Sequence, residues 1–375
     1  MVIILPLITF PYQEKRVTPP LLLQADNFTP PQRTPWGGTR IASVFKPFLG
    51  IAAGTIVGES WEISVEPDFP SRLADSDSLL SKSIAAAPED WLGRDASVGS
   101  VALLVKLLDA ASPLSVQIHP ADNDPGLAPD ESGKPESWYI LDREPGAGLY
   151  LGLREGVTEA SMRSAIQEGQ DVSQLLYFVP VEPGDCFFIA AGTAHAIGPG
   201  ITLVEPQRVI PGRRGLTYRY WDWNRRYDEE GRPNSTGKER PLHLEEALRV
   251  TRWDAPREER LLEKIRHRAG RPAQEPRLEP LIGPSAPTSS NLLQVTRISG
   301  TGSLVLPTAE HFRGLTVARG SVQADTGWRV GSGQSAAIPA CLPATELLLD
   351  QAEAIVCSAP LSDAGPLTSD PHKST

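Results

Sequence analysis

Short hydrophobic runs, separated by glycine, proline and aspartate, dominate the chain from residue 101 onward. Some runs are continuously apolar and others alternate apolar with polar residues, as buried and half-buried β-strands do. The clearest runs are VALLVKLL, LSVQIH, SWYIL, DCFFIA and ITLVEP. Many short strands with turn residues between them are typical of an antiparallel barrel or sandwich. The pattern therefore predicts a mainly β fold.

Helical periodicity interrupts these strands in a few places. The segments that we expect to be helical are residues 76–93, Val157 to Gln167, a second helix that begins at Asp171, and Leu242 to Val250. Asp171 is followed three residues later by Gln174, a spacing found at helix N-termini. In the last segment Leu244, Ala247 and Leu248 share one helical face. We interpret all of these as short insertions between strands.

Changes in composition divide the chain into segments. Charged residues dominate 255–268, and the following stretch, RPAQEPRLEPLIGPSAPTSS, is rich in proline and is typical of a linker. The predicted segments are an N-terminal extension (1–21), a first domain with helical insertions (22–268), a Pro-rich linker (269–290), a second strand-rich domain (291–358) and a disordered tail (359–375).

A weak internal repeat relates the two strand-rich regions. Gly184 begins GDCFFIAAGTAH and Gly333 begins GQSAAIPACLPA, each a turn glycine, five strand residues and a corner. Where the first copy has His195, the second has Ala344. The simplest explanation is two related barrels, of which only the first can bind a metal.

Composition excludes several classes of protein. A net charge of −10 argues against binding to nucleic acid. The three cysteines, Cys186, Cys341 and Cys357, are few and widely spaced, which favours a reduced interior without disulfides. The apolar N-terminus lacks a basic region and contains prolines, so we interpret it as a strand or arm and not as a signal peptide. No apolar run reaches the length of a membrane span, and we expect a cytoplasmic protein without membrane partners.

Four residues form a candidate metal site. Gln117 and His119 are two positions apart on one predicted strand and therefore share a face. Glu136 precedes the strand SWYIL, and His195 follows a strand and a turn. A single histidine or glutamate of this kind is more often structural. Together, an amide, a carboxylate and two imidazoles make a mixed nitrogen and oxygen ligand set that suits Zn²⁺.

The region around these residues is similar to a known family. The spacing from Gly184 through Gly192 to His195 follows the second cupin motif, with Ala190 where that motif usually has proline. The chain resembles the type I phosphomannose isomerases, also called mannose-6-phosphate isomerases. The similar segments are TPWGGTRI (34–41), GESWEIS (58–64), LLVKLLDAASPLSVQIHP (103–120), GKPESWYIL (133–141), EPGDCFFIAAGTAHAIGPGITLVEPQ (182–207) and LTYRYWDWNRR (216–226).

This resemblance implies two cupin-type (jelly-roll) barrels with short helices between strands. It also implies one zinc ion per chain, held by the residues that match Gln117, His119, Glu136 and His195. The implied reaction interconverts mannose 6-phosphate and fructose 6-phosphate through an enediol. The implied partner is a small sugar phosphate, and the oligomeric state stays open.

Three residues are candidates for catalysis. Lys134 lies two residues before Glu136, so in an extended segment both share a face, and the resemblance places Lys134 in the catalytic pocket. Beside a cation we expect a depressed pKa for Lys134 and a role in proton transfer. Arg219 matches the family's catalytic arginine. Glu205, on the strand after His195, is a second acid/base candidate, and the choice between Lys134 and Glu205 stays open.

Three more residues are candidates for binding substrate. Lys106 lies in an otherwise apolar strand, where a lysine is costly unless it faces a polar cavity, and the resemblance suggests a phosphate contact. Ser115 is on the same face as Gln117 and could donate to that phosphate. Trp36 is a candidate wall of the sugar pocket, as is Trp61, for which core packing is an equal alternative.

The chain departs from the family before Arg219. Family members usually have Ser-Asp where this chain has Arg214-Gly215, and the spacing from Glu205 to Arg219 is longer by about four residues than is usual in the family. This leaves the exact sugar phosphate open. Two other functions remain as alternatives: a non-catalytic cupin that binds sugar phosphates, and a metal-dependent cupin dioxygenase with iron.

Overall fold

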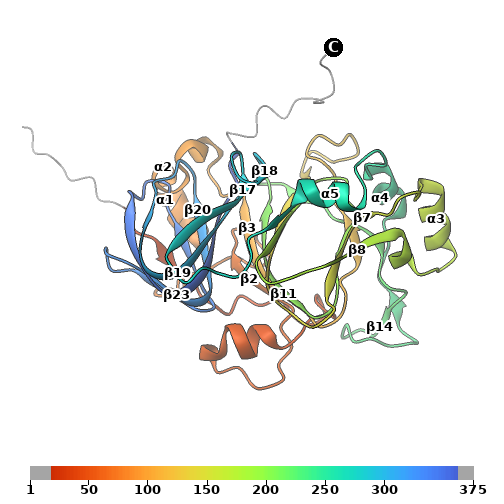
Figure 1. The fold of residues 1–375 in the computed structure, drawn as a ribbon, viewed down its shortest axis with the longest axis horizontal. Helices are drawn as coiled ribbons and strands as arrows, with labels where there is room; N and C mark the ends of the chain where they lie inside the picture. The colour runs from red at the N-terminus through yellow and green to blue at the C-terminus, as the bar shows by residue number, and fades with distance from the viewer. Residues whose placement is uncertain (1–17, 362–375) are drawn as a thin grey trace, which may run out of the picture.

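Antiparallel sheets make up most of the protein, so the prediction of a mainly β fold is confirmed. The computed structural model describes residues 18–361. The N-terminal extension, up to residue 17, and the predicted tail from residue 362 lie outside the described residues. In Figure 1 the C-terminal strands β19 (Gln294–Leu306), β20 (Arg313–Ala324) and β23 (Thr345–Ser358) lie at the left of the molecule.

Two sheets face each other in the region that contains the candidate site. The six-stranded sheet has the order β16 (Arg266–Arg268), β9 (Asp185–Ile189), β6 (Glu136–Arg143), β11 (Ile201–Arg208), β3 (Leu103–Ala110) and β2 (Glu59–Ile63). The five-stranded sheet has the order β13 (Tyr218–Trp221), β4 (Val116–Ile118), β10 (His195–Ile197), β7 (Gly148–Leu153) and β8 (Leu176–Pro180). All the apolar runs that suggested strands lie in these two sheets.

A third, eight-stranded sheet contains the C-terminal strands. Its order is β1 (Leu21–Leu22), β22 (Gln334–Ile338), β20, β23, β19, β17 (Arg277–Gly283) and β18 (Thr288–Ser289), with β21 (Arg329–Gly331) paired to β20. Strand β17 falls within the stretch predicted as a linker and pairs with β19. Two small pairs complete the strands: β5 (Glu131–Ser132) with β12 (Arg214–Gly215), and β14 (Arg226–Tyr227) with β15 (Lys238–Glu239).

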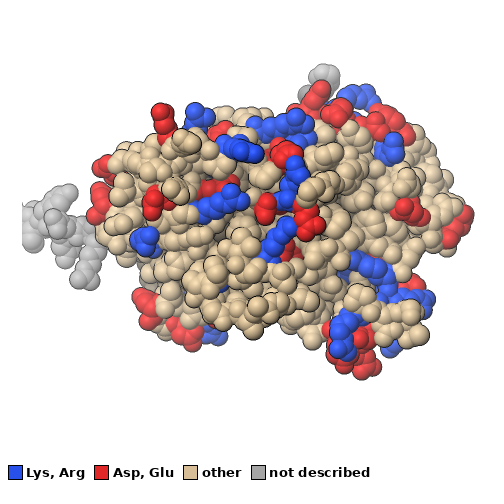
Figure 2. Space-filling model, turned by 60° about the horizontal axis from the view of Figure 1, so that its bottom comes forward, with Lys and Arg blue, Asp and Glu red and all other residues tan. Residues whose placement is uncertain are grey.

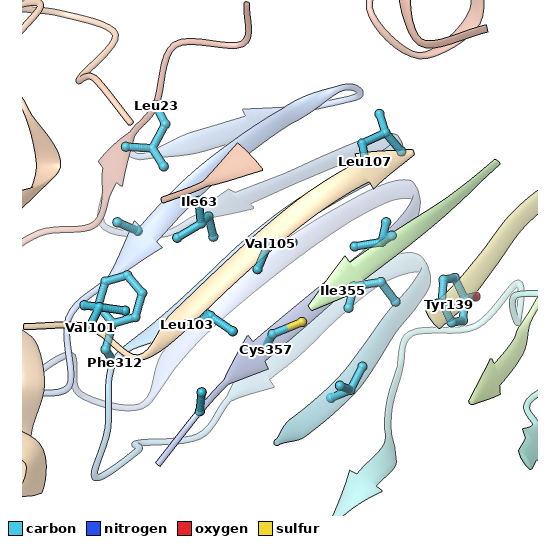
Figure 3. Close-up of a cluster of buried hydrophobic side chains, with 14 of the residues drawn as sticks. Leu23, Ile63, Val101, Leu103, Val105, Leu107, Tyr139, Phe312, Ile355 and Cys357 are labelled. Atoms are coloured by element: carbon cyan, nitrogen blue, oxygen red, sulfur yellow. The ribbon is translucent and has the colours of Figure 1, made fainter. Parts of the chain in front are cut away.

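The six-stranded sheet is buried on both faces, which explains its continuous apolar runs. On β3, Leu103, Val105 and Leu107 belong to the core shared with the eight-stranded sheet, where Ile355 and Cys357 oppose them (Figure 3). The alternate residues of β3 face the five-stranded sheet instead. One of these alternate residues is Lys106, so the alternation along the strand brings its ammonium group to the site.

Helices lie between strands, as expected. They are α1 (Leu80–Ala86), α2 (Pro88–Leu92), α3 (Glu159–Gln167), α4 (Leu244–Val250) and α5 (Glu258–Ile265), with a π-helical turn (Ile41–Phe45) and 3₁₀ turns (Pro47–Leu49, Gly93–Val98, Val172–Leu175). The Asp171 side chain caps the last 3₁₀ turn by accepting from the Ser173 N–H at 3.0 Å. Helix α5 was missed because charged residues dominate its sequence, although Leu261, Leu262 and Ile265 pack into the core.

The two halves of the internal repeat have the same local structure. Gly184 and Gly333 both have positive φ angles, of 93° and 74°, and each precedes a five-residue strand, β9 or β22. In each case a backbone carbonyl lies where a Cβ would be, which excludes other residues. The repeat is therefore visible in the structure, although Ala344 carries no ligand atom in its side chain.

Other predictions concern chemistry and location. All three cysteines are free: Cys186 and Cys357 are buried and Cys341 is exposed. Within residues 18–361, no helix combines the length and the apolar character that spanning a bilayer requires. On the face that Figure 2 presents, acidic and basic side chains are interspersed and form no single continuous acidic patch.

Candidate metal centre and active site

Three buried side chains converge between the two facing sheets. Ligand atoms of His119, Glu136 and His195 all lie within 4.8 Å of one another. His195 Nε2 lies 3.2 Å from Glu136 Oε1. Each of the three residues is at most 3% exposed, so water does not satisfy them from the bulk. Side chains of this chemistry, held this close, can bind a divalent cation.

The strands explain why these residues meet. Gln117 on β4 pairs directly with His195 on β10 in the five-stranded sheet. His119 follows β4 two residues after Gln117. Glu136 is the first residue of β6, as predicted, but β6 belongs to the opposite, six-stranded sheet. The site therefore bridges both sheets.

Hydrogen bonds orient two of the three ligands. Thr193 O lies 2.8 Å from His195 Nδ1, so that nitrogen carries the proton and donates to the carbonyl. The other ring nitrogen, Nε2, faces Glu136. Gln207 Nε2 donates to Glu136 Oε2 at 3.0 Å and holds the carboxylate from behind. Partners of this kind fix the direction of metal ligands.

His119 is the clearest sign that a ligand is required. The residue is fully buried, and neither ring nitrogen makes a hydrogen bond of good geometry within residues 18–361. Burial lowers the pKa of His119 to about 3, so its imidazole is neutral. Only one of its two ring nitrogens then carries a proton. A buried polar group without a partner costs free energy. A metal ion bound to one nitrogen would remove that cost.

Gln117, the fourth predicted ligand, lies near these three residues. Its Nε2 donates to Ser115 Oγ at 3.0 Å, which turns the amide so that its carbonyl oxygen has no hydrogen bond within the described residues. Gln117 lines the same cavity as Glu136 and His195. The cavity thus offers an amide oxygen near one carboxylate and two imidazoles, a donor set that fits a zinc ion.

Lys134 lies next to the candidate ligands. Its Nζ is 3.4 Å from Glu136 Oε2. Burial lowers the pKa of Lys134, but the Glu136 and Glu205 carboxylates act more strongly together and raise it. The protein groups by themselves therefore raise this pKa, and the depression expected beside a bound cation stays a prediction. In turn, burial opposes ionisation of Glu136, but Lys134 and His195 outweigh it and hold the pKa of Glu136 far below its usual range.

Glu205 is the second titratable group of the cavity. Its Oε1 accepts from Trp138 Nε1 at 2.9 Å, and its Oε2 lies 3.8 Å from Lys106 Nζ. Burial, and after it the charge of Glu136, raises the pKa of Glu205 to about 7. A carboxyl group with this pKa can both accept and release a proton near neutral pH. Lys106 also lies over the Trp61 ring, 4.8 Å from its centroid.

A cavity of about 210 Å³ joins these groups. Of the eleven residues that the sequence singled out, His119 lies beside this cavity and Trp61 lines the larger cleft described next. The other nine line the cavity: Trp36, Lys106, Ser115, Gln117, Lys134, Glu136, His195, Glu205 and Arg219. Four lining residues, Arg33, Lys106, Lys134 and Gln207, also line a larger cleft of about 1030 Å³. Both residues of β12, Arg214 and Gly215, line this cleft.

Several residues of the site were not predicted. Gln207 and Trp138 hold Glu136 and Glu205, and Arg240 lines the cavity beside Arg219. Gln207 is two residues beyond Glu205 on β11, so the alternation of the strand could have identified it. Arg240 gives no such pattern, because it reaches the cavity from a separate segment after β15.

Comparisons with known proteins agree with this geometry. Residues 30–142 match the family described as phosphomannose isomerase type I, catalytic domain. The mannose-6-phosphate isomerase of Streptococcus mutans is 34% identical over 218 residues, which are 57% of this chain and 63% of that protein. Mannose-6-phosphate isomerase ManA of Bacillus subtilis is 38% identical over 149 residues, 40% of this chain and 43% of that protein. The chain thus spans less than two thirds of the length of these relatives.

Solved structures share the fold over most of the chain. The crystal structure of a mannose 6-phosphate isomerase from Bacillus subtilis has a TM-score of 0.68 at 24% identity, covering 91% of this chain and 99% of that one. A putative mannosephosphate isomerase from Archaeoglobus fulgidus has a TM-score of 0.66 at 21% identity, covering 92% and 100%. The segment that matches the type I phosphomannose isomerase catalytic domain, residues 30–142, contains Gln117, His119 and Glu136.

Proposed function

We propose that the protein is a zinc-dependent mannose-6-phosphate isomerase, which interconverts mannose 6-phosphate and fructose 6-phosphate through an enediol. The observation that supports this most is His119, a buried imidazole whose ring nitrogens make no hydrogen bond of good geometry within residues 18–361, beside Glu136 and His195. The same cavity contains the Glu205 carboxyl group, whose pKa is near neutrality, and the cationic side chains of Lys134 and Arg219. Aldose–ketose isomerisation needs a group that transfers a proton and groups that stabilise negative charge on oxygen.

One zinc ion would be held by Gln117, His119, Glu136 and His195. When bound, it would supply a Lewis acid that polarises the substrate oxygens at C1 and C2. A structurally similar mannose 6-phosphate isomerase has been described with zinc and yttrium bound. In this chain the support comes from the donor set and from the unsatisfied His119 nitrogens.

The proton moves between C1 and C2 of the open-chain sugar. We assign this transfer to Glu205, because its raised pKa lets the carboxylate accept a proton that it can return. Trp138 and Lys106 hold the two oxygens of Glu205 in place. The raised pKa of Lys134 keeps its ammonium group protonated, so its proposed role is to stabilise negative charge on the sugar oxygens.

Arg219 has the geometry of a group that contacts the substrate. It lies opposite Gln117 on the neighbouring strand β13, and its Nε is 3.4 Å from Ser115 Oγ. Its only other side-chain donor contact within the described residues is from Nη1 to Pro241 O, at 2.8 Å, so no carboxylate neutralises it there. Trp36 forms part of the cavity wall and belongs to the adjacent core.

The experiment is a coupled assay for fructose 6-phosphate made from mannose 6-phosphate. We expect turnover that a chelator abolishes and that added zinc restores. His119→Ala should lose both zinc and turnover, whereas His267→Gln, a matched change in β16 outside the cavity, should retain both. Zinc-loaded protein that binds mannose 6-phosphate without converting it would instead support a non-catalytic binding protein, and oxygen consumption would indicate a dioxygenase. We also propose a cytoplasmic location.

A further inference from the structure

An unusual group of charges lies at the Arg219 end of the cavity. Asp222 is only 4% exposed, and two guanidinium groups contact it. Arg240 donates to it through both Nε and Nη2, each at 2.7 Å, and Arg225 donates through Nη2 at 2.5 Å. Burial opposes ionisation of Asp222, but its hydrogen bond from Arg240 lowers its pKa, so the carboxylate is charged. One carboxylate therefore serves two cations.

Arg219 adds a third cation to this group. The Arg219 main chain is hydrogen-bonded to His243, three residues after Arg240, and the charge of Arg240 contributes, after burial, to lowering the pKa of Arg219. Both line the metal cavity. Three guanidinium groups with one carboxylate leave an excess of positive charge there, in a chain whose net charge is −10. Buried like charges are costly unless an anion is bound between them.

The structure holds Arg240 firmly in place. Two parallel donor bonds to Asp222 fix the plane of the guanidinium group, and the Tyr227 ring lies 5.4 Å from its Cζ. The following residues are tied to β13: Arg219 N donates to His243 Nδ1 at 3.1 Å, and His243 N donates to Arg219 O at 2.9 Å. Arg240 is thus a pre-arranged group and not a mobile surface arginine.

We propose that Arg240, positioned by Asp222, forms a phosphate subsite together with Arg219 and the Ser115 hydroxyl. A phosphate dianion matches this set, because two guanidinium groups and a hydroxyl supply several donors to its oxygens. Lys106, the residue first considered for the phosphate, is instead paired with Glu205 and stacked on Trp61. This inference rests on the proposed function only for the identity of the sugar that carries the phosphate.

The test measures binding of inorganic phosphate by calorimetry, which needs no turnover. Arg240→Gln should bind phosphate roughly tenfold more weakly or worse, the effect of losing one charge-assisted hydrogen bond. The matched control is Arg226→Gln, on the β14–β15 hairpin, where Arg226 pairs with Glu239 outside the cavity. This control should bind phosphate like the unsubstituted protein. If turnover is present, Arg240→Gln should raise the KM for mannose 6-phosphate by a similar factor at nearly unchanged kcat.

Two results would overturn the subsite. One is unchanged phosphate affinity in folded Arg240→Gln. The other is a fall in kcat of equal size for mannose 6-phosphate and for unphosphorylated mannose, which would mean that Arg240 only positions Arg219. If Arg240→Gln does not fold, crystals of the unsubstituted protein with inorganic phosphate decide the matter. Phosphate in contact with Arg219 and Arg240 supports the subsite, and phosphate at Lys106 alone, or at neither place, contradicts it.

Discussion

Gln117 lies directly opposite His195 across the pairing of β4 with β10, and opposite Arg219 across the pairing of β4 with β13. One residue of a three-residue strand therefore lies between a candidate metal ligand and a candidate substrate contact. Because paired strands fix the spacing of opposite residues, the distance between metal and guanidinium is set by the backbone and not by flexible loops. This arrangement suits a reaction that needs a fixed substrate.

Zinc affinity should depend on Gln207, which holds Glu136 through a hydrogen bond of 3.0 Å. Without this bond the carboxylate is less well oriented. We expect Gln207→Ala to weaken zinc binding by roughly 10- to 100-fold, as is typical for partners of metal ligands. Competition with a chelating dye at fixed pH measures this. Gln294→Ala, in β19 of the third sheet, is the control and should leave zinc affinity unchanged.

Stability of the metal-free protein should depend on pH through Glu205. Its pKa is raised from 4.5 to about 7, chiefly by burial and then by Glu136. A raised carboxyl pKa means that its contribution to stability is complete below pH 4.5 and is lost as the pH rises through 7. Relative to that of Glu205→Gln, the free energy of unfolding of the unsubstituted protein should therefore fall by roughly 3 kcal/mol as the pH rises from 4.5 to about 7.

Denaturant unfolding of both metal-free proteins at several pH values tests this sign. The difference in the free energy of unfolding between Glu205→Gln and the unsubstituted protein should grow with increasing pH and level off above neutrality. The exposed Glu182→Gln serves as control, because Glu182 only pairs with Arg143 at the surface. A difference that stays constant with pH would show that Glu205 has an ordinary pKa.

The buried ion pair between Lys46 and Glu62 should be essential for stability. Their charged atoms lie 2.7 Å apart, both side chains are at most 2% exposed, and Ser335 of β22 donates to Glu62. Lys46→Met would leave an uncompensated buried carboxylate, at a cost of about 3–5 kcal/mol. Adding Glu62→Leu should recover much of the loss. Urea unfolding of the single and double variants measures these changes in the free energy of unfolding. A double variant that is less stable than Lys46→Met would contradict the pairing.

Gly215 should matter for activity because of its closeness to Lys134. A Cβ at this position would lie 3.3 Å from Lys134 Cβ and Cγ, closer than side chains normally pack. Gly215→Val should therefore displace Lys134 and lower kcat on the order of tenfold while the zinc content stays at one per chain. Gly215→Ala should have a smaller effect in the same direction. Equal activity in all three proteins would show that Lys134 adjusts freely.

Strand alternation made much of the site predictable. Lys106, Glu136 and Glu205 face one cavity because each lies on the same face of the six-stranded sheet, and an apolar run interrupted by one lysine indicates such a face. The family-like segments then identified their partners on the other sheet. No sequence pattern shows which two sheets face each other. Only the structure therefore showed that Glu136 and His195 lie in different sheets.

Other features could not be predicted from the sequence, chiefly because they depend on contacts with other parts of the fold. Arg240 is placed by Asp222, a partner 18 residues earlier, and neither residue has a periodic pattern that marks it. In α5 the exposed charges obscured the apolar face formed by Leu261 and Ile265. Strand β17 contains Pro280, which normally argues against a strand, but the register shifts between Pro280 and Ile282 and so accommodates it.

Strand β1 has a consequence for biosynthesis. Leu21 and Leu22 are among the first described residues to leave the ribosome, yet their partners, Ala337 and Ala336, lie near the other end of the chain. Pairings between residues so far apart in sequence form slowly. The early segment must therefore wait, without its pairing partners, until the distant strand β22 has been made. Chaperones that shield short apolar stretches during translation should find their target there.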